Sequence, residues 1–156
     1  MNIHLLTVGN KMPAWVQQGT TEYLKRMPHQ CRVKLIEIIP TKRTKNSDIK
    51  RIIADESARL LAAVPKNNKI VALDVKGKAW STEQLALKME DWMHSGQDIA
   101  LLIGGAEGLS QDCLNAAQQR WSLSALTFPH PLVRVILAEQ LYRGWSVLNG
   151  HPYHRE

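Results

Sequence analysis

The sequence predicts an α/β protein with a mainly parallel sheet and helices on both of its faces. Short β-branched or leucine-rich runs recur along the chain, and helix-length segments separate them. The 156 residues contain no internal repeat, low-complexity tract or linker. We therefore expect a single domain over residues 1–156, long enough to bury roughly two-thirds of its unfolded surface.

Five strands and five helices are expected in alternation. The strands span residues 3–9, 33–39, 69–75, 99–105 and, with the weakest pattern, 122–128. The helices span 13–27 from Pro13, 47–63 capped by Ser47, 81–95 with the cap signature "STEQ", about 110–119 capped by Ser110, and 131–149 from Pro131. The last helix is apolar almost all round, which predicts burial in the core or against another subunit.

The positive charge of the chain is concentrated in its first half. Residues 1–75 hold 13 Lys and Arg against 6 Asp and Glu, whereas the remainder is nearly neutral and the total is +6. Five cations lie close together in "PTKRTKNSDIKR", residues 40–51, here called the basic segment: Lys42, Arg43, Lys45, Lys50 and Arg51. The segment predicts contact with nucleic-acid phosphates, and the alternative is a solvated loop and helix face.

The cysteines and the apolar runs argue against a disulfide-bonded, metal-binding or membrane-spanning protein. Cys31 and Cys113 lack the spacing of metal ligands, so we expect free thiols in a reducing cytosol and no metal. The N-terminus lacks a signal pattern, and no run approaches the roughly 18 apolar residues of a membrane span. We therefore expect a soluble cytoplasmic protein without a membrane partner.

Three glycines follow the fourth expected strand in "LLIGGAEGLS". Gly104, Gly105 and Gly108 either let a ligand approach the backbone beyond the strand end or permit a tight turn. The stretch lacks the lysine of a phosphate-binding P-loop, and its glycines do not follow the dinucleotide pattern G-x-G-x-x-G. Glu107, within the turn, is expected to cap the following helix.

A second unusual stretch, "LSALTFPHPLVRV", leads into the last helix. It confines His130 between Pro129 and Pro131, which is expected to hold the chain extended just before the helix begins. Together with "LLIGGAEGLS" and the terminal "NGHPYHRE", this stretch resembles the SPOUT-class RNA methyltransferases, and the resemblance covers the whole chain. It implies a C-terminal trefoil knot, a homodimer, S-adenosylmethionine as methyl donor, and methylation of N3 of a pseudouridine in 23S rRNA, on the assembled ribosome.

By position, the resemblance also implies the donor-binding residues. They are Leu73 at the end of the third strand, Gly104 and Gly105, and the loop residues Leu123, Ser124, Ala125, Leu126, Thr127 and Phe128. Main-chain groups at the glycines are expected to hold the donor where a Cβ atom would clash.

Methyl transfer to N3 requires alignment of the two reactants and loss of the N3 proton. Histidine is the default proton acceptor near neutral pH, and His130 and His154 are the candidates. We expect Tyr153 to stack on or hydrogen-bond the base and Arg155 to bind phosphate or developing negative charge. Two alternatives remain open, a non-catalytic ribosome-binding factor and a nicotinamide-dependent oxidoreductase.

Overall fold

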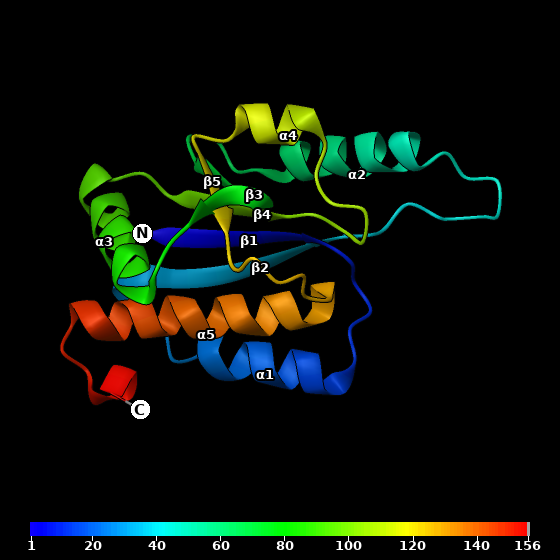
Figure 1. The fold of residues 1–156 in the computed structure, drawn as a ribbon. Coiled ribbons are helices and arrows are strands. Elements are labelled where there is room, and N and C mark those ends of the chain that lie inside the picture. Colours follow the sequence, from blue (N-terminus) through cyan, green and yellow to red (C-terminus); the bar gives the residue numbers. More distant parts are fainter. Residues whose placement is uncertain (156) are drawn as a thin grey trace.

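The computed structural model describes residues 1–155, which form one five-stranded parallel sheet in the order β2-β1-β4-β3-β5 (Figure 1). In chain order the strands are β1 Asn2–Val8, β2 Arg32–Ile38, β3 Lys69–Ala79, β4 Ile99–Ile103 and β5 Gln119–Ser122. Their register aligns Leu5 of β1 with Leu35 of β2 and Leu101 of β4. The predicted mainly parallel sheet is confirmed.

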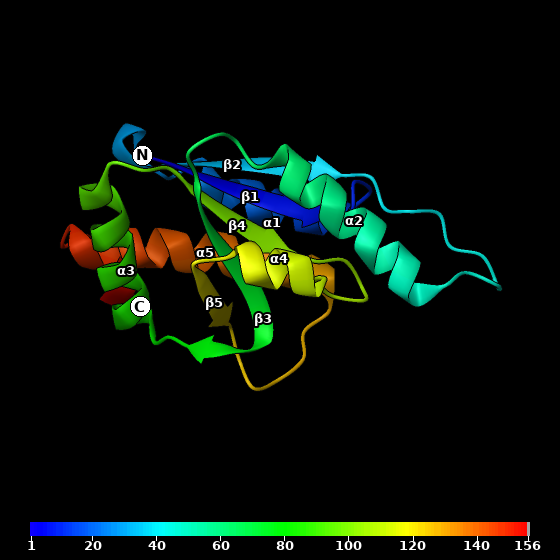
Figure 2. The ribbon, with the colours of Figure 1, turned by 90° about the horizontal axis from the view of Figure 1, so that it is seen from above.

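Helices cover both faces of this sheet, as expected. They are α1 Ala14–Leu24, α2 Ile49–Ala63, α3 Thr82–Ser95, α4 Gln111–Ala116 and α5 His130–Leu148, with short 3-10 helices η1 His29–Cys31 and η2 Pro152–Arg155. In Figure 1, α2 and α4 lie above the sheet, whereas α1 and α5 lie below it. Figure 2, seen from above, shows α2 and α4 lying over the strands.

Two apolar cores, one on each face, follow from the alternation of side chains along the strands. Leu5 and Leu101 are completely buried in the core formed with α3 and α5, whereas the neighbouring residues Leu6 and Leu102 are completely buried in the core formed with α2. Strands buried on both faces read as continuous apolar runs, which is why 99–103 is so easily recognised.

The cap residues set most of the helix starts. Ser81 and Gln84 form the predicted capping box, and Ser110 accepts from the Cys113 backbone N–H. The predicted caps Ser47 and Glu107 are wrong: Asp48 caps α2, and the α4 cap is supplied by Ser110.

The weakest predicted strand, 122–128, is also wrong. The fifth strand occupies Gln119–Ser122, of which only Gln119 falls in the helix expected at about 110–119 and only Ser122 falls in the expected strand, and the residues after it are irregular. Gln119 pairs with Val71 of β3, so cross-strand pairing decides the position of this strand against the local apolar pattern.

The last helix lies beneath the sheet, packed against α1 and α3 (Figure 1). It begins at His130, one residue before the predicted Pro131, because Pro129 serves as its N-cap. His130 is therefore the first helical residue and not part of an extended entry. Leu137 and Leu141 are fully buried, which contributes about 1.5–3 kcal/mol for each side chain.

Other expectations concern the cysteines and the membrane. Cys31 and Cys113 are buried free thiols, as predicted, and burial raises the pKa of Cys31 to about 11. Among residues 1–155, none of the helices has the length and apolar character to span a membrane. The trefoil knot remains an expectation from the resemblance.

Candidate functional site

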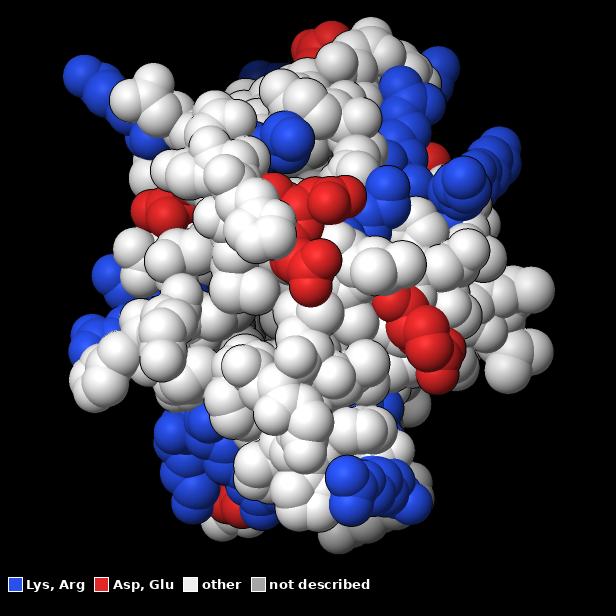
Figure 3. Space-filling view, turned by 90° about the vertical axis from the view of Figure 1, so that its left-hand side faces the viewer, with Lys and Arg blue, Asp and Glu red and all other residues white. Residues whose placement is uncertain are grey.

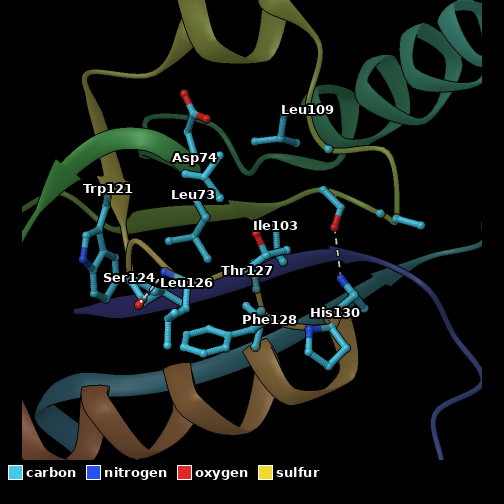
Figure 4. Close-up of a pocket in the computed structure, with 18 of the residues that line it drawn as sticks. Leu73, Asp74, Ile103, Leu109, Trp121, Ser124, Leu126, Thr127, Phe128 and His130 are labelled. Atoms are coloured by element: carbon cyan, nitrogen blue, oxygen red, sulfur yellow. Dashed lines mark hydrogen bonds between the residues drawn. The ribbon is translucent and has the colours of Figure 1, made fainter.

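A cavity of about 610 Å³ opens where β3, β4 and β5 lead into their following loops (Figure 4). This is the edge of a parallel sheet at which ligands usually bind. Leu73 points across the cavity toward Leu126 and Phe128, and Ile103 contributes from the end of β4. Three segments that are distant in the sequence therefore build one largely apolar site.

Eight of the nine residues expected at the donor line this cavity. They are Leu73, Gly104, Gly105, Leu123, Ser124, Leu126, Thr127 and Phe128. Ala125, the ninth, is exposed and does not line the cavity. Asp74, Leu109 and Trp121 also line the cavity but were missed, and the position of Asp74 directly after Leu73 at a predicted strand end was a usable signal.

The glycines are required by the turn itself, residues 104–108. A Cβ atom on Gly104 would lie 2.5 Å from the carbonyl carbon of Gly108, because the turn folds back on its own backbone. The Gly108 N–H donates to the Gly105 carbonyl at 3.0 Å, and Gly108 has a φ of +86°. The absence of a Cβ atom at Gly104 therefore makes room for the turn, which is the tight-turn alternative, and the turn then lines the cavity.

The loop formed by residues 123–129 supplies the opposite wall. The Ser124 side chain accepts from the Leu126 N–H at 2.9 Å, and the Ser122 hydroxyl donates to the Ser124 carbonyl at 3.1 Å. These bonds pair one backbone carbonyl and one backbone N–H of a loop that has no neighbouring strand to pair with. Leu126 is 69% exposed at the cavity mouth, so an apolar surface is available to a bound molecule.

Helix α2 supports the glycine turn from behind. The Ser110 N–H, just after the turn, donates to the Ser57 side chain at 2.9 Å. The Glu56 carboxylate accepts from the Thr41 N–H at 3.0 Å, and a Cβ on Gly105 would lie 3.2 Å from it. One buried turn of α2 thus touches both the glycine turn and the basic segment.

His130 lies at the cavity wall, where its Nδ1 is 3.0 Å from the Gly104 carbonyl oxygen (Figure 4). Its Nε2 accepts from the Arg134 Nε–H at 3.3 Å. Burial, followed by the charge of Arg134, lowers the pKa of His130 below its usual range. The imidazole is therefore neutral around pH 7.

The C-terminal tail, residues 150–155, lies away from the cavity. His154 Nδ1 is 2.9 Å from the Ser146 hydroxyl, and Ser146 is 16 residues along α5 from His130, or about 24 Å at 1.5 Å per residue. Figure 1 shows the tail at the opposite end of the helix. A single chain therefore does not bring Tyr153, His154 and Arg155 together with His130 and the cavity.

Tyr153 anchors the tail to α5. Its hydroxyl donates to Glu139 at 3.0 Å, and its ring packs on Tyr142 and beneath the Arg143 guanidinium. Burial, followed by hydrogen bonds to Tyr23 and Glu139, raises the pKa of Tyr153, so the phenol stays protonated. Glu139 also forms an ion pair with Arg143, one helical turn further along α5, at 2.7 Å.

The five cations of the basic segment are exposed on the loop after β2 and on the first turn of α2. This loop extends away from the sheet (Figure 1). Arg43 lies 3.4 Å from buried Glu56, which offsets part of its charge, so the lysines are the better candidates for phosphate contact. On the face shown in Figure 3, basic and acidic side chains are interspersed.

Known proteins resemble the chain over nearly its whole length. A family model described as predicted SPOUT methyltransferase matches residues 1–154. A protein of Thioalkalivibrio sulfidiphilus named ribosomal RNA large subunit methyltransferase H is 58% identical over 100% of both chains. The protein of the same name from Methylococcus capsulatus is 57% identical over 99% of this chain and 100% of its own.

A solved structure of a probable methylase family protein from Haemophilus influenzae matches the fold. It superposes with a TM-score of 0.60 at 12% identity and covers 97% of this chain and 68% of its own. A likeness at this identity supports the arrangement of the helices and strands, while the sequence relatives carry the family.

Proposed function

The chain belongs to the SPOUT methyltransferase family, and from this premise we propose that it transfers a methyl group from S-adenosylmethionine to N3 of a pseudouridine in 23S rRNA. The proposal rests mainly on the cavity, which lies where the end of β3, the glycine turn and the 123–129 loop meet. The 58% identical relative named as a large-subunit rRNA methyltransferase supports the RNA substrate.

The cavity fits the proposed donor in size and chemistry. Its volume of about 610 Å³ lies in the range of small-molecule sites. Leu73, Leu126 and Phe128 offer apolar surface to an adenine ring, while the glycine turn and the 123–129 loop offer main-chain groups for its polar edges. When bound, S-adenosylmethionine supplies a methyl group already activated on a sulfonium.

The chain's own residues must then align the base and remove its N3 proton. We assign proton removal to His154, binding of phosphate or developing charge to Arg155, and contact with the base to Tyr153. His154 is suited because Ser146 holds its Nδ1, and among residues 1–155 no hydrogen bond involves its Nε2. The tail and the cavity are far apart in one chain, so the site requires the tail of a second copy in a homodimer.

The basic segment collects the RNA for this site. Its loop is attached to α2 through the Thr41–Glu56 hydrogen bond, and the same helix supports the glycine turn. The exposed cations of the basic segment support ribosomal RNA as the partner, and we place the reaction in the cytoplasm on the assembled ribosome.

Removing two lysines of the basic segment tests its role. We expect Lys42→Ala/Lys45→Ala to weaken RNA binding for every sequence and to reduce the slope of log affinity against log salt by about two. Lys25→Ala/Lys66→Ala removes the same charge from exposed positions outside the segment and is expected to leave the slope unchanged. Filter binding across a salt series measures both, and equal slopes for the two variants would exclude the segment as the RNA contact.

The proposed function is tested directly by calorimetry and methyl mapping. We expect saturable binding of S-adenosylmethionine, and transfer of its labelled methyl to ribosomes from a strain that lacks the gene. Mass mapping of the 23S rRNA should place the methyl on a pseudouridine, with naked rRNA compared in parallel. RNA binding without donor binding would indicate a non-catalytic ribosome-binding factor, and binding of a nicotinamide dinucleotide would indicate the oxidoreductase.

A further inference from the structure

A buried arginine connects the start of α5 to two strands. Arg134 is 2% exposed, and its guanidinium donates to the Glu37 carboxylate at 2.7 Å and to the Gly9 carbonyl at 2.6 Å. Glu37 lies on β2 and Gly9 directly follows β1. A buried guanidinium needs hydrogen-bond partners, and the contacts of its two Nη atoms fix the direction of the donor on its third nitrogen, Nε–H.

That third donor determines the protonation of His130. Arginine carries N–H donors and no acceptor, so the Nε2 atom of His130, 3.3 Å from Arg134 Nε, must present its lone pair. The neutral ring then carries its proton on Nδ1, which donates to the Gly104 carbonyl at 3.0 Å. The heavy-atom contacts alone thus select one tautomer.

We propose that His130 is a positioning residue: Arg134 imposes the Nδ1-protonated neutral tautomer, and that N–H holds the Gly104 carbonyl at the wall of the cavity. Gly104 begins the turn that folds back on Gly108, so the hydrogen bond from α5 fixes the turn from the cavity side. The opposite side of the same turn is held by α2 through Ser57 and Ser110.

The proposal removes His130 from the candidates for proton acceptor. Its lone pair is already used by Arg134, and protonation at Nε2 would break that bond and place two cations in contact. Burial and Arg134 also lower the pKa of His130, and the carboxylate nearby, Glu37, is taken up by Arg134. The role in proton removal then falls to the tail of the second copy, so this part of the inference rests on the proposed function.

The tautomer can be read on the unmodified protein. Long-range ¹H–¹⁵N NMR is expected to show that the His130 ring has a protonated Nδ1 and an unprotonated Nε2 between pH 7 and 9. His130→Asn identifies that ring. A His130 ring protonated at Nε2 in this pH range would overturn the proposal whether or not the chain methylates RNA.

Two substitutions separate positioning from proton transfer. Asparagine places its amide nitrogen close to the position of Nδ1, so His130→Asn is expected to keep donor affinity and the maximal rate within about threefold, with the same pH profile. His130→Leu removes the N–H group that donates to the Gly104 carbonyl. We expect it to weaken S-adenosylmethionine binding about tenfold, the upper range for one lost hydrogen bond. His94→Asn, on the exposed face of α3, is the control for loss of a histidine.

Each contrary result is distinct. A His130→Asn enzyme that binds the donor normally but loses its rate and one limb of its pH profile would make His130 the proton acceptor and overturn the proposal while leaving the proposed function intact. Unchanged donor affinity in His130→Leu would exclude a positioning role. Failure of the unmodified protein to bind S-adenosylmethionine would refute the proposed function, and the NMR result would still decide the tautomer.

Discussion

Gly104→Ala is expected to abolish most donor binding and methyl transfer. The new Cβ would lie 2.5 Å from the Gly108 carbonyl carbon and 2.9 Å from the Leu109 nitrogen, so the turn must open. Overpacking of this kind costs about 1–3 kcal/mol. If the strain is relieved by moving the cavity wall, donor affinity falls by about 5- to 150-fold. Calorimetry with S-adenosylmethionine measures this loss.

A matched glycine elsewhere controls for general destabilisation. Gly96 ends α3 with a φ of +73°, and a Cβ there would meet no atom within 4 Å. Gly96→Ala therefore costs about 1–2 kcal/mol of backbone strain without touching the cavity. We expect its melting temperature to fall and its donor affinity to remain that of the unmodified protein. A Gly104→Ala protein with normal donor affinity would show that the glycine turn is not part of the donor site.

His154→Ala/Arg155→Ala is expected to lower methyl transfer by about 10²- to 10⁴-fold, the range for loss of general acid–base catalysis, while donor affinity stays within about twofold. The tail is about 24 Å along α5 from His130, so in the proposed site it acts on the cavity of a second copy. Rates and donor affinity measured on the same preparation separate the two effects. Full activity would remove the tail from the site.

Mixed dimers test whether the site is shared between two copies. One chain carries Gly104→Ala and the other carries His154→Ala/Arg155→Ala, with a different affinity tag on each so that only heterodimers are purified. If each site combines the cavity of one copy with the tail of the other, one site is doubly damaged and the other is intact. The heterodimer then has about half the activity of the unmodified dimer, whereas either homodimer has little. An inactive heterodimer would place both parts in the same chain.

Much of the fold follows from local patterns. The continuous apolar run at 99–103 and the box of Ser81 and Gln84 identified β4 and α3, because burial on both faces and helix capping leave local signals. The fifth strand was misplaced because its short stretch, Gln119–Ser122, has a single apolar residue, Trp121, and is held by pairing with β3. Pairing across the sheet is not visible in a local window.

The residues that line the candidate site were predictable from the sequence. The long-range hydrogen bonds that hold the site together were not. The glycine turn and the 123–129 loop were expected to meet, and they line one cavity. Arg134 was given no role, because Glu37, its partner, is 97 residues away. A lone arginine near the start of an otherwise apolar helix was a usable signal, since charged residues are almost never fully buried without a partner. In one chain the tail lies at the far end of α5 from the cavity, so the proposed site needs the tail of a second copy.

A crystal structure of the full chain with S-adenosylmethionine would decide whether the cavity is the donor site. We expect the donor between the glycine turn and the 123–129 loop, with the His130–Gly104 hydrogen bond intact and the tail of a second copy at the cavity mouth. A donor bound elsewhere on the chain, or a cavity filled by the protein's own side chains at saturating donor, would contradict it.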